Sequence, residues 1–110
     1  IAEEYLLGHE LSVFALSGGE GYVLLEPAVD HKKALPGNRG PNTGGMGALA
    51  PAPRGDRALM ARIEREIVAP SFAAMAARGL SYRGVLFFGV MVTAEGPRLL
   101  EYNVRFGDPE

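Results

Sequence analysis

The sequence predicts an α+β fold in which helices cover a mainly antiparallel sheet. Strand patterning lies toward both ends of the chain, helical patterning is confined to residues 56–79, and a long irregular loop precedes the helices. With 110 residues, of which 47% are hydrophobic and 22% charged, the chain is large enough for one hydrophobic core. We therefore expect one domain or a part of one.

The N-terminal quarter is predicted to form three strands. Residues 1–7 and 11–16 are apolar-rich segments of strand length, and a turn at residues 8–10 is expected to join them. A glycine-rich turn at 17–21 leads to the third strand, residues 22–25, because glycine adopts positive φ without steric cost. From residue 30 to 53 the periodicity disappears, and a loop of this length in a compact domain is usually functional or disordered.

The helical region is predicted to contain two helices, followed by a hairpin. Asp56 is the expected N-cap of a helix that carries Leu59, Ile63 and Ile67 at four-residue spacing. Pro70 is expected to end or kink this helix because proline has no N–H, and a second helical stretch then runs to Gly79, a typical C′ residue. Residues 85–92 predict a strand buried on both faces, and residues 98–104 are expected to run back beside it.

Polar side chains share one face of the last predicted strand. Because strand side chains alternate, Glu101, Asn103 and Arg105 fall on the same side. Carboxylate and amide oxygens two residues apart suit Mg²⁺, and a neighbouring guanidinium suits a phosphate or carboxylate. The alternative is a solvated strand face with a surface ion pair.

Two segments of the long loop could bind an anionic ligand. Asp30, His31, Lys32 and Lys33 supply an acid, an imidazole and two cations. Glycine-rich residues 40–47 could direct several backbone N–H groups toward one anion, with further donors from the side chains of Asn42 and Thr43. This loop matches neither the Walker A nor the Rossmann pattern. The alternatives are an ordinary polar segment and a flexible loop.

Carboxylates flank the first predicted turn. An extended segment here could present its backbone to a purine edge, with Glu10 accepting from a ribose hydroxyl. Solvated carboxylates at strand ends are the alternative, and His9 is a weaker candidate.

Composition argues against several classes of protein. The net charge is −2 and the arginines are scattered, so we expect no nucleic-acid surface. Without cysteine there are no disulfides or thiolate metal sites, which fits a reducing compartment. The longest apolar run, residues 85–92, is too short to cross a bilayer, and no signal peptide is visible. We therefore expect a cytoplasmic protein without membrane association.

The chain starts without Met and stops directly after a strand-like segment, so we expect both ends to be incomplete.

Five motifs follow one another along the chain: EEYLLGHE at 3–10, DHKK at 30–33, GPNTGGMGA at 40–48, RGVL at 83–86 and LEYNVRFGDPE at 100–110. Together they closely resemble the phosphoribosylamine–glycine ligase family of the ATP-grasp superfamily. The resemblance implies that residues 1–110 are part of an ATP-grasp domain, its C-terminal lobe. It also implies an enzyme of de novo purine synthesis that joins glycine to 5-phosphoribosylamine through a glycyl phosphate, releasing ADP and phosphate.

The resemblance also implies roles for individual residues. Adenine would lie against a hinge, the ribose would contact Glu10, and ATP would be bound with Mg²⁺, or with Mn²⁺ in its place, on Glu101 and Asn103. Arg105, with Asp30, His31 and Lys32, would be catalytic. The hinge residues are Glu3, Glu4, Tyr5 and Leu6, and the substrate-binding residues are Asn42, Thr43, Gly44, Gly45, Met46, Gly47 and Asp108.

One position departs from the wider superfamily. An additional acidic metal ligand commonly lies on the strand before the hairpin, where this chain has Phe87, Phe88 and Gly89. The number of metal ions is therefore open. The missing lobes of the same polypeptide are the expected partners, and the chain alone is expected not to catalyse. The alternatives are another ATP-grasp carboxylate–amine ligase, and a non-catalytic remnant that binds a nucleotide or, through exposed apolar surface, a partner.

Overall fold

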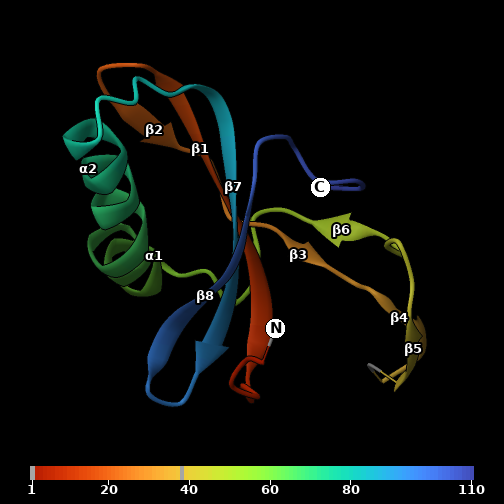
Figure 1. Ribbon diagram of the computed structural model, residues 1–110. Coiled ribbons are helices and arrows are strands. Elements are labelled where there is room, and N and C mark those ends of the chain that lie inside the picture. The colour runs from red at the N-terminus through yellow and green to blue at the C-terminus, as the bar shows by residue number, and fades with distance from the viewer. Residues whose placement is uncertain (1, 38) are drawn as a thin grey trace.

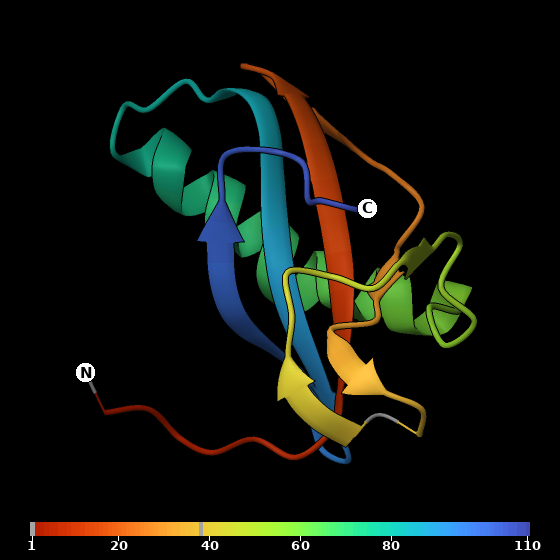
Figure 2. The same ribbon diagram turned by 90° about the vertical axis from the view of Figure 1, so that its right-hand side faces the viewer.

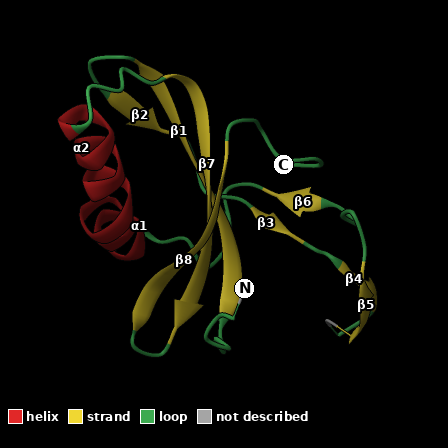
Figure 3. Ribbon diagram, viewed as in Figure 1, coloured by secondary structure: helices red, strands yellow, loops and turns green. Residues whose placement is uncertain are grey.

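A four-stranded antiparallel sheet with a helical layer on one face forms the centre of the molecule (Figures 1 and 3). The computed structural model describes residues 2–37 and 39–110. The strand order is β2 (Tyr22–Leu24), β1 (His9–Gly18), β7 (Arg83–Thr93) and β8 (Gly96–Asn103). This arrangement confirms the predicted α+β class with a mainly antiparallel sheet.

The first predicted strand and turn are wrong. Residues 2–7 form no strand, and Figure 2 shows them leading away from the sheet, with the side chains of Tyr5 and Leu7 exposed. Apolar content gave the strand pattern here, but a strand also needs a partner for its backbone groups. Ile1 lies outside the described residues. Residues 8–10 make no turn either: β1 begins at His9, and pairing with β7 is continuous from His9↔Val92 to Gly18↔Arg83.

The helical layer is one irregular helix rather than two. It consists of α1 (Arg57–Ile63), a π-helical turn η1 (Glu64–Val68) and α2 (Ala69–Ala77). Asp56 caps it as predicted, accepting from the N–H of Leu59 at 2.8 Å. Pro70 does not end the helix. The N–H of Ala69 bonds the carbonyl of Glu64, and the wide π-helical turn tolerates the absence of an N–H at Pro70. Gly79 follows the C-cap with φ +72°, as expected of a C′ residue.

The core lies on both faces of β7. Phe88, Val13 and Val90 pack with Ile63 and Val68 of the helix, and all five side chains are fully buried. On the other face lies a smaller cluster of Phe14, Phe87 and Ala28, where the ring of Phe106 also lies 5.7 Å from that of Phe14. The prediction of a strand buried on both faces is therefore confirmed.

A bulge in β8 determines which of its side chains face the helix. Gly89 pairs with Glu101 but Val90 pairs with Leu99, so Leu100 is an extra residue. Beyond it, Tyr102 points to the helical layer, with its hydroxyl 2.8 Å from that of Ser71. Glu101 and Asn103 consequently share the opposite face, as predicted, whereas the strand ends at Asn103 and does not reach residue 104.

The long loop is more ordered than its composition suggested. It contains two small antiparallel pairs, β3 (Val29–Asp30) with β6 (Ala48–Leu49) and β4 (Lys33–Leu35) with β5 (Arg39–Asn42). They lie on the side of the central sheet away from the helices (Figure 1). Asn38 lies outside the described residues. Within the described ranges, no helix is long and apolar enough to cross a membrane.

Candidate functional site

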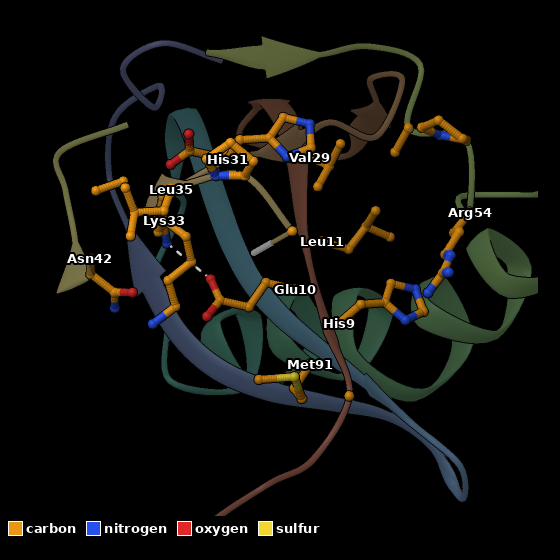
Figure 4. A pocket seen from close by; sticks show the side chains of 18 residues that line it. His9, Glu10, Leu11, Val29, His31, Lys33, Leu35, Asn42, Arg54 and Met91 are labelled. Atoms are coloured by element: carbon orange, nitrogen blue, oxygen red, sulfur yellow. Dashed lines mark hydrogen bonds and ion pairs between the residues drawn. The ribbon is translucent and has the colours of Figure 1, made fainter. Parts of the chain in front are cut away.

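A cavity of about 780 Å³ lies between the beginning of β1 and the first part of the long loop (Figure 4). Its volume falls within the range of small-molecule sites, roughly 300–1,000 Å³. It is lined by residues 8–11, 29–37, 42, 52–54 and 91. Several residues predicted from the sequence are thereby brought together, namely Glu10, Asp30, His31, Lys32 and Asn42.

The backbone of β1 offers unpaired groups to this cavity. Ser12 exchanges two backbone hydrogen bonds with Ala28, and Phe14 accepts one from Leu25, so these residues direct their backbone groups away from β7. Glu10 belongs to the same alternation, and within the described chain its N–H and C=O have no partner on that edge. A ligand with a donor and an acceptor could bind there.

Lys32 and Glu10 form the principal ion pair of the cavity. Nζ of Lys32 lies 3.0 Å from Oε2 of Glu10. Burial lowers the pKa of Lys32, but the hydrogen bond and charge of Glu10, together with Asp30 and Glu101, raise it above its ordinary value. Lys32 is therefore positively charged at neutral pH and lies in the field of carboxylates from three different segments.

Asp30 occupies an unfavourable place for a carboxylate. Burial, followed by the charge of Glu110, raises its pKa, while Lys32 and His31 partly oppose that rise. Its Oδ1 is buried without a hydrogen-bond partner among the described residues. Such a group is a candidate for proton transfer, because its pKa lies closer to neutrality than that of an ordinary aspartate.

In the full-length polypeptide, replacing Asp30 by asparagine should leave stability at pH 7 unchanged or raise it by less than about 1 kcal/mol, while lowering activity about a hundredfold. Because the pKa is raised, the folded state binds the proton of Asp30 more tightly than the unfolded state does. The free energy of unfolding therefore falls as the pH rises from 3.8, the ordinary pKa, through the pKa of the folded state. Hydrogen exchange in β3 and steady-state kinetics measure the two effects. Strong destabilisation at pH 7 would contradict this account of Asp30.

The glycine-rich loop is braced against residues 31 and 32. Thr43 donates its N–H to the carbonyl of Lys32 at 2.7 Å, Met46 donates to His31 at 2.8 Å, and Gly47 accepts from His31 at 3.0 Å. Gly45 donates to the hydroxyl oxygen of Thr43 at 3.1 Å. The N–H groups of Thr43, Gly45 and Met46 are thus used internally, so the structure does not direct them at an anion as the composition had suggested.

Gly45 is the point of closest packing in this loop. Its φ is +123°, and a Cβ would lie 2.6 Å from Cδ of Pro109 and 3.0 Å from Oδ1 of Asp30. Replacing Gly45 by alanine should displace the loop from Asp30 and lower the kcat/KM of the full-length polypeptide about tenfold or more. Gly44→Ala is the matched control, since a Cβ there meets nothing within 4 Å. Equal kinetics for the two variants would show that this packing is unimportant.

Glu101 and Asn103 form a small oxygen site on the sheet face opposite the helices. Nδ2 of Asn103 donates to Oε1 of Glu101 at 3.3 Å, and the amide oxygen of Asn103 has no partner among the described residues. Gly89 lies beneath them, and a Cβ there would be 3.0 Å from Cγ of Glu101. No group of three or more His, Cys, Asp or Glu side chains suited to a metal occurs in the described residues. One carboxylate and one amide fit Mg²⁺, which takes its remaining ligands from water and phosphate.

Other predicted residues lie outside the cavity. Glu3, Glu4, Tyr5 and Leu6 belong to the extended N-terminal segment. Arg105 follows the end of β8 and donates to the carbonyl of Phe106 at 2.9 Å, so it does not continue the strand face as predicted. The carbonyl of Asp108 would lie 3.3 Å from a Cβ at Gly45, which places it beside the glycine-rich loop.

Three residues near the cavity carried little or no signal in the sequence. Arg54 lines the cavity beside His9, whose pKa is lowered by burial and then by the charge of Arg54. Oε1 of Glu110 accepts from the hydroxyl of Ser12 at 2.7 Å. Strand alternation through His9 could have placed that side chain, but no local pattern marks Arg54 or links Glu110 to β1.

Comparison with known proteins gives one consistent result. The family described as "Phosphoribosylglycinamide synthetase, ATP-grasp (A) domain" matches residues 1–110. Proteins named phosphoribosylamine–glycine ligase from Rhodopirellula baltica and Agrobacterium fabrum are 52% and 50% identical over all of this chain, which covers 25% and 26% of them. The crystal structure of phosphoribosylamine–glycine ligase from Thermotoga maritima matches 97% of the chain with a TM-score of 0.85 at 38% identity, covering 27% of that protein. The chain thus spans about a quarter of these relatives.

Proposed function

The chain belongs to the phosphoribosylglycinamide synthetase ATP-grasp (A) domain family, and we propose that it is part of a cytoplasmic ligase joining glycine to 5-phosphoribosylamine. The observation that carries this proposal is the similarity across the whole chain to proteins named for that reaction. The remainder of the polypeptide would supply the other lobe of the ATP-grasp domain. Its substrates would be ATP, glycine and phosphoribosylamine, and its products ADP, phosphate and glycinamide ribonucleotide.

The reaction needs positioning and charge neutralisation more than a side-chain nucleophile. In the first step, an oxygen of the glycine carboxylate attacks the γ-phosphorus of ATP, and ADP leaves. In the second, the amine of phosphoribosylamine attacks the carbonyl carbon of glycyl phosphate, phosphate leaves with the electrons of the broken C–O bond, and the amine loses a proton.

The side chains of the cavity suit these steps. Lys32, kept charged by Glu10, would attract the substrate carboxylate or a phosphate. Asp30, with its raised pKa, would accept the proton that the amine loses, and His31 would donate a hydrogen bond. The braced loop at residues 42–47, with Asp108, would hold the substrates over these groups. Arg105 would steady the transferred phosphoryl group from beyond the end of β8.

Nucleotide and metal would bind at neighbouring positions. The hinge at residues 3–6 would contact adenine, and Glu10 would accept from a ribose hydroxyl through Oε1, since Oε2 is paired with Lys32. Glu101 and Asn103 would hold Mg²⁺, or Mn²⁺ in its place, which neutralises charge on the ATP phosphates when bound. The alternation beyond the β8 bulge supports this assignment, because it gives the two side chains a common face.

Substrate-dependent release of ADP by the full-length polypeptide tests the proposal. We expect sustained release over many turnovers to require both glycine and phosphoribosylamine, and Lys32→Met to lower it strongly. The control Arg98→Met removes a cation from the far end of the β7–β8 hairpin, where Arg98 pairs with Glu95. Release that prefers another carboxylate over glycine would instead identify a different ATP-grasp carboxylate–amine ligase. No release with any carboxylate would indicate a non-catalytic binding protein.

A further inference from the structure

One wall of the cavity carries two basic side chains that the proposed reaction does not use. His9 and Arg54 lie next to each other, across the cavity from His31 and Lys33 (Figure 4). Alternation along β1 gives His9 the same face as Leu11 and separates it from the side chain of Glu10.

The segments carrying this pair are both fixed by backbone hydrogen bonds. His9 pairs with Val92 at the start of β1. Arg54 lies in a tight connection, where the N–H of Ala52 bonds the carbonyl of Pro27 at 2.7 Å and the N–H of Gly55 bonds that of Ala52 at 2.9 Å. The backbone at both residues is therefore fixed, and the two side chains need little backbone rearrangement to bind a ligand in the cavity.

Neither side chain has a hydrogen-bond or ion-pair partner within the described part of the chain. Nε2 of His9 is buried and has no hydrogen-bond partner there. Arg54 makes no ion pair or hydrogen bond with any described residue, whereas Lys32 is neutralised by Glu10 at 3.0 Å. An unpaired buried polar group such as Nε2 of His9 is unfavourable in the absence of a partner. Arg54 is exposed, so its guanidinium is open to solvent and accessible to a ligand. The pair thus presents an imidazole nitrogen and a guanidinium that have no hydrogen-bond partner among the described residues.

We propose that His9 and Arg54 form a subsite for a phosphate group at this wall of the cavity. A guanidinium binds two oxygens of a phosphate side by side, and the third oxygen remains for a donor from another direction, here Nε2–H of His9. A carboxylate fits less well, because a bidentate guanidinium already engages both of its oxygens. The cavity volume of about 780 Å³ leaves room for the rest of a sugar phosphate or a nucleotide.

Titration calorimetry on the full-length polypeptide tests this subsite, with ribose 5-phosphate and ADP as separate ligands. We expect Arg54→Gln to raise the Kd of one of them about tenfold and His9→Gln to raise it several-fold, with the double variant little worse than Arg54→Gln. The ligand affected identifies the source of the phosphate. Arg57→Gln is the control, since Arg57 is exposed at the start of α1 and does not line this cavity.

Nuclear magnetic resonance of labelled histidine gives a second, direct measurement. The His9 imidazole signal, assigned through its loss in His9→Gln, should shift when inorganic phosphate is added to the wild-type protein and should stay in place in Arg54→Gln. The subsite would be disproved by a His9 signal that ignores phosphate, or by Kd values within twofold of wild type for both ligands in both variants. Equal weakening by Arg57→Gln would also disprove it, because a general charge effect would then explain the loss.

Discussion

Replacing Glu101 by glutamine is expected to lower the kcat proposed for the full-length polypeptide about a hundredfold to a thousandfold. The substitution keeps the shape of the side chain, which packs over Gly89, and removes the charge proposed to hold Mg²⁺. Because Glu101 is exposed, stability should change by less than about 0.5 kcal/mol. Steady-state release of ADP over a range of Mg²⁺ concentrations would show a lower kcat together with a higher Mg²⁺ requirement.

Glu95→Gln provides the matched control for this experiment. Glu95 is an exposed glutamate in the turn of the same hairpin, and its carboxylate pairs only with Arg98, at 3.2 Å, among the described residues. Its removal should leave kcat and the Mg²⁺ requirement unchanged. If Glu101→Gln instead behaves like Glu95→Gln, the metal is held elsewhere and the assignment of the β8 face is wrong.

Replacing Phe88 by alanine is expected to destabilise this part of the fold by about 3–5 kcal/mol. Phe88 is fully buried, belongs to the cluster between the sheet and the helix, and lies 5.5 Å from the ring of Tyr102. Its loss would leave a cavity that the paired strands β1 and β7 cannot close. Hydrogen exchange of β7 amides in the full-length protein measures the change in local opening free energy.

Phe106→Ala is the control for this prediction. Phe106 is 53% exposed and touches the smaller cluster through Phe14, so its removal should cost much less than that of Phe88. Equal loss of protection in the two variants would mean that the core between sheet and helix does not dominate the stability of β7.

The fold could be predicted from the sequence wherever burial imposes a periodic pattern. Residues 85–92 are apolar on both faces and form a strand buried on both faces, and Leu59, Ile63 and Ile67 mark the helix. The prediction of a strand at residues 1–7 was wrong because apolar content says nothing about a hydrogen-bonding partner. The prediction that the helix ends at Pro70 was wrong for a different reason. A π-helical turn, which sequence patterns do not reveal, accommodates the proline.

The site could be predicted only where its residues are close in sequence. Alternation placed Glu101 and Asn103 on one face, and the β8 bulge at Leu100 preserved that relation because it precedes both. The same alternation did not place Arg105 on this face, since the strand ends two residues before it. The pairing of Lys32 with Glu10, and that of Glu110 with Ser12, join segments far apart in the chain. Only the folded topology determines such contacts.

Anomalous diffraction from crystals of the full-length polypeptide, grown with Mn²⁺ and a non-hydrolysable ATP analogue, would locate the metal and the nucleotide. We expect a manganese peak bound by the carboxylate of Glu101 and the amide oxygen of Asn103, with the γ-phosphate directed toward Lys32. A manganese ion and nucleotide bound away from the face that carries Glu101 and Asn103 would contradict this assignment.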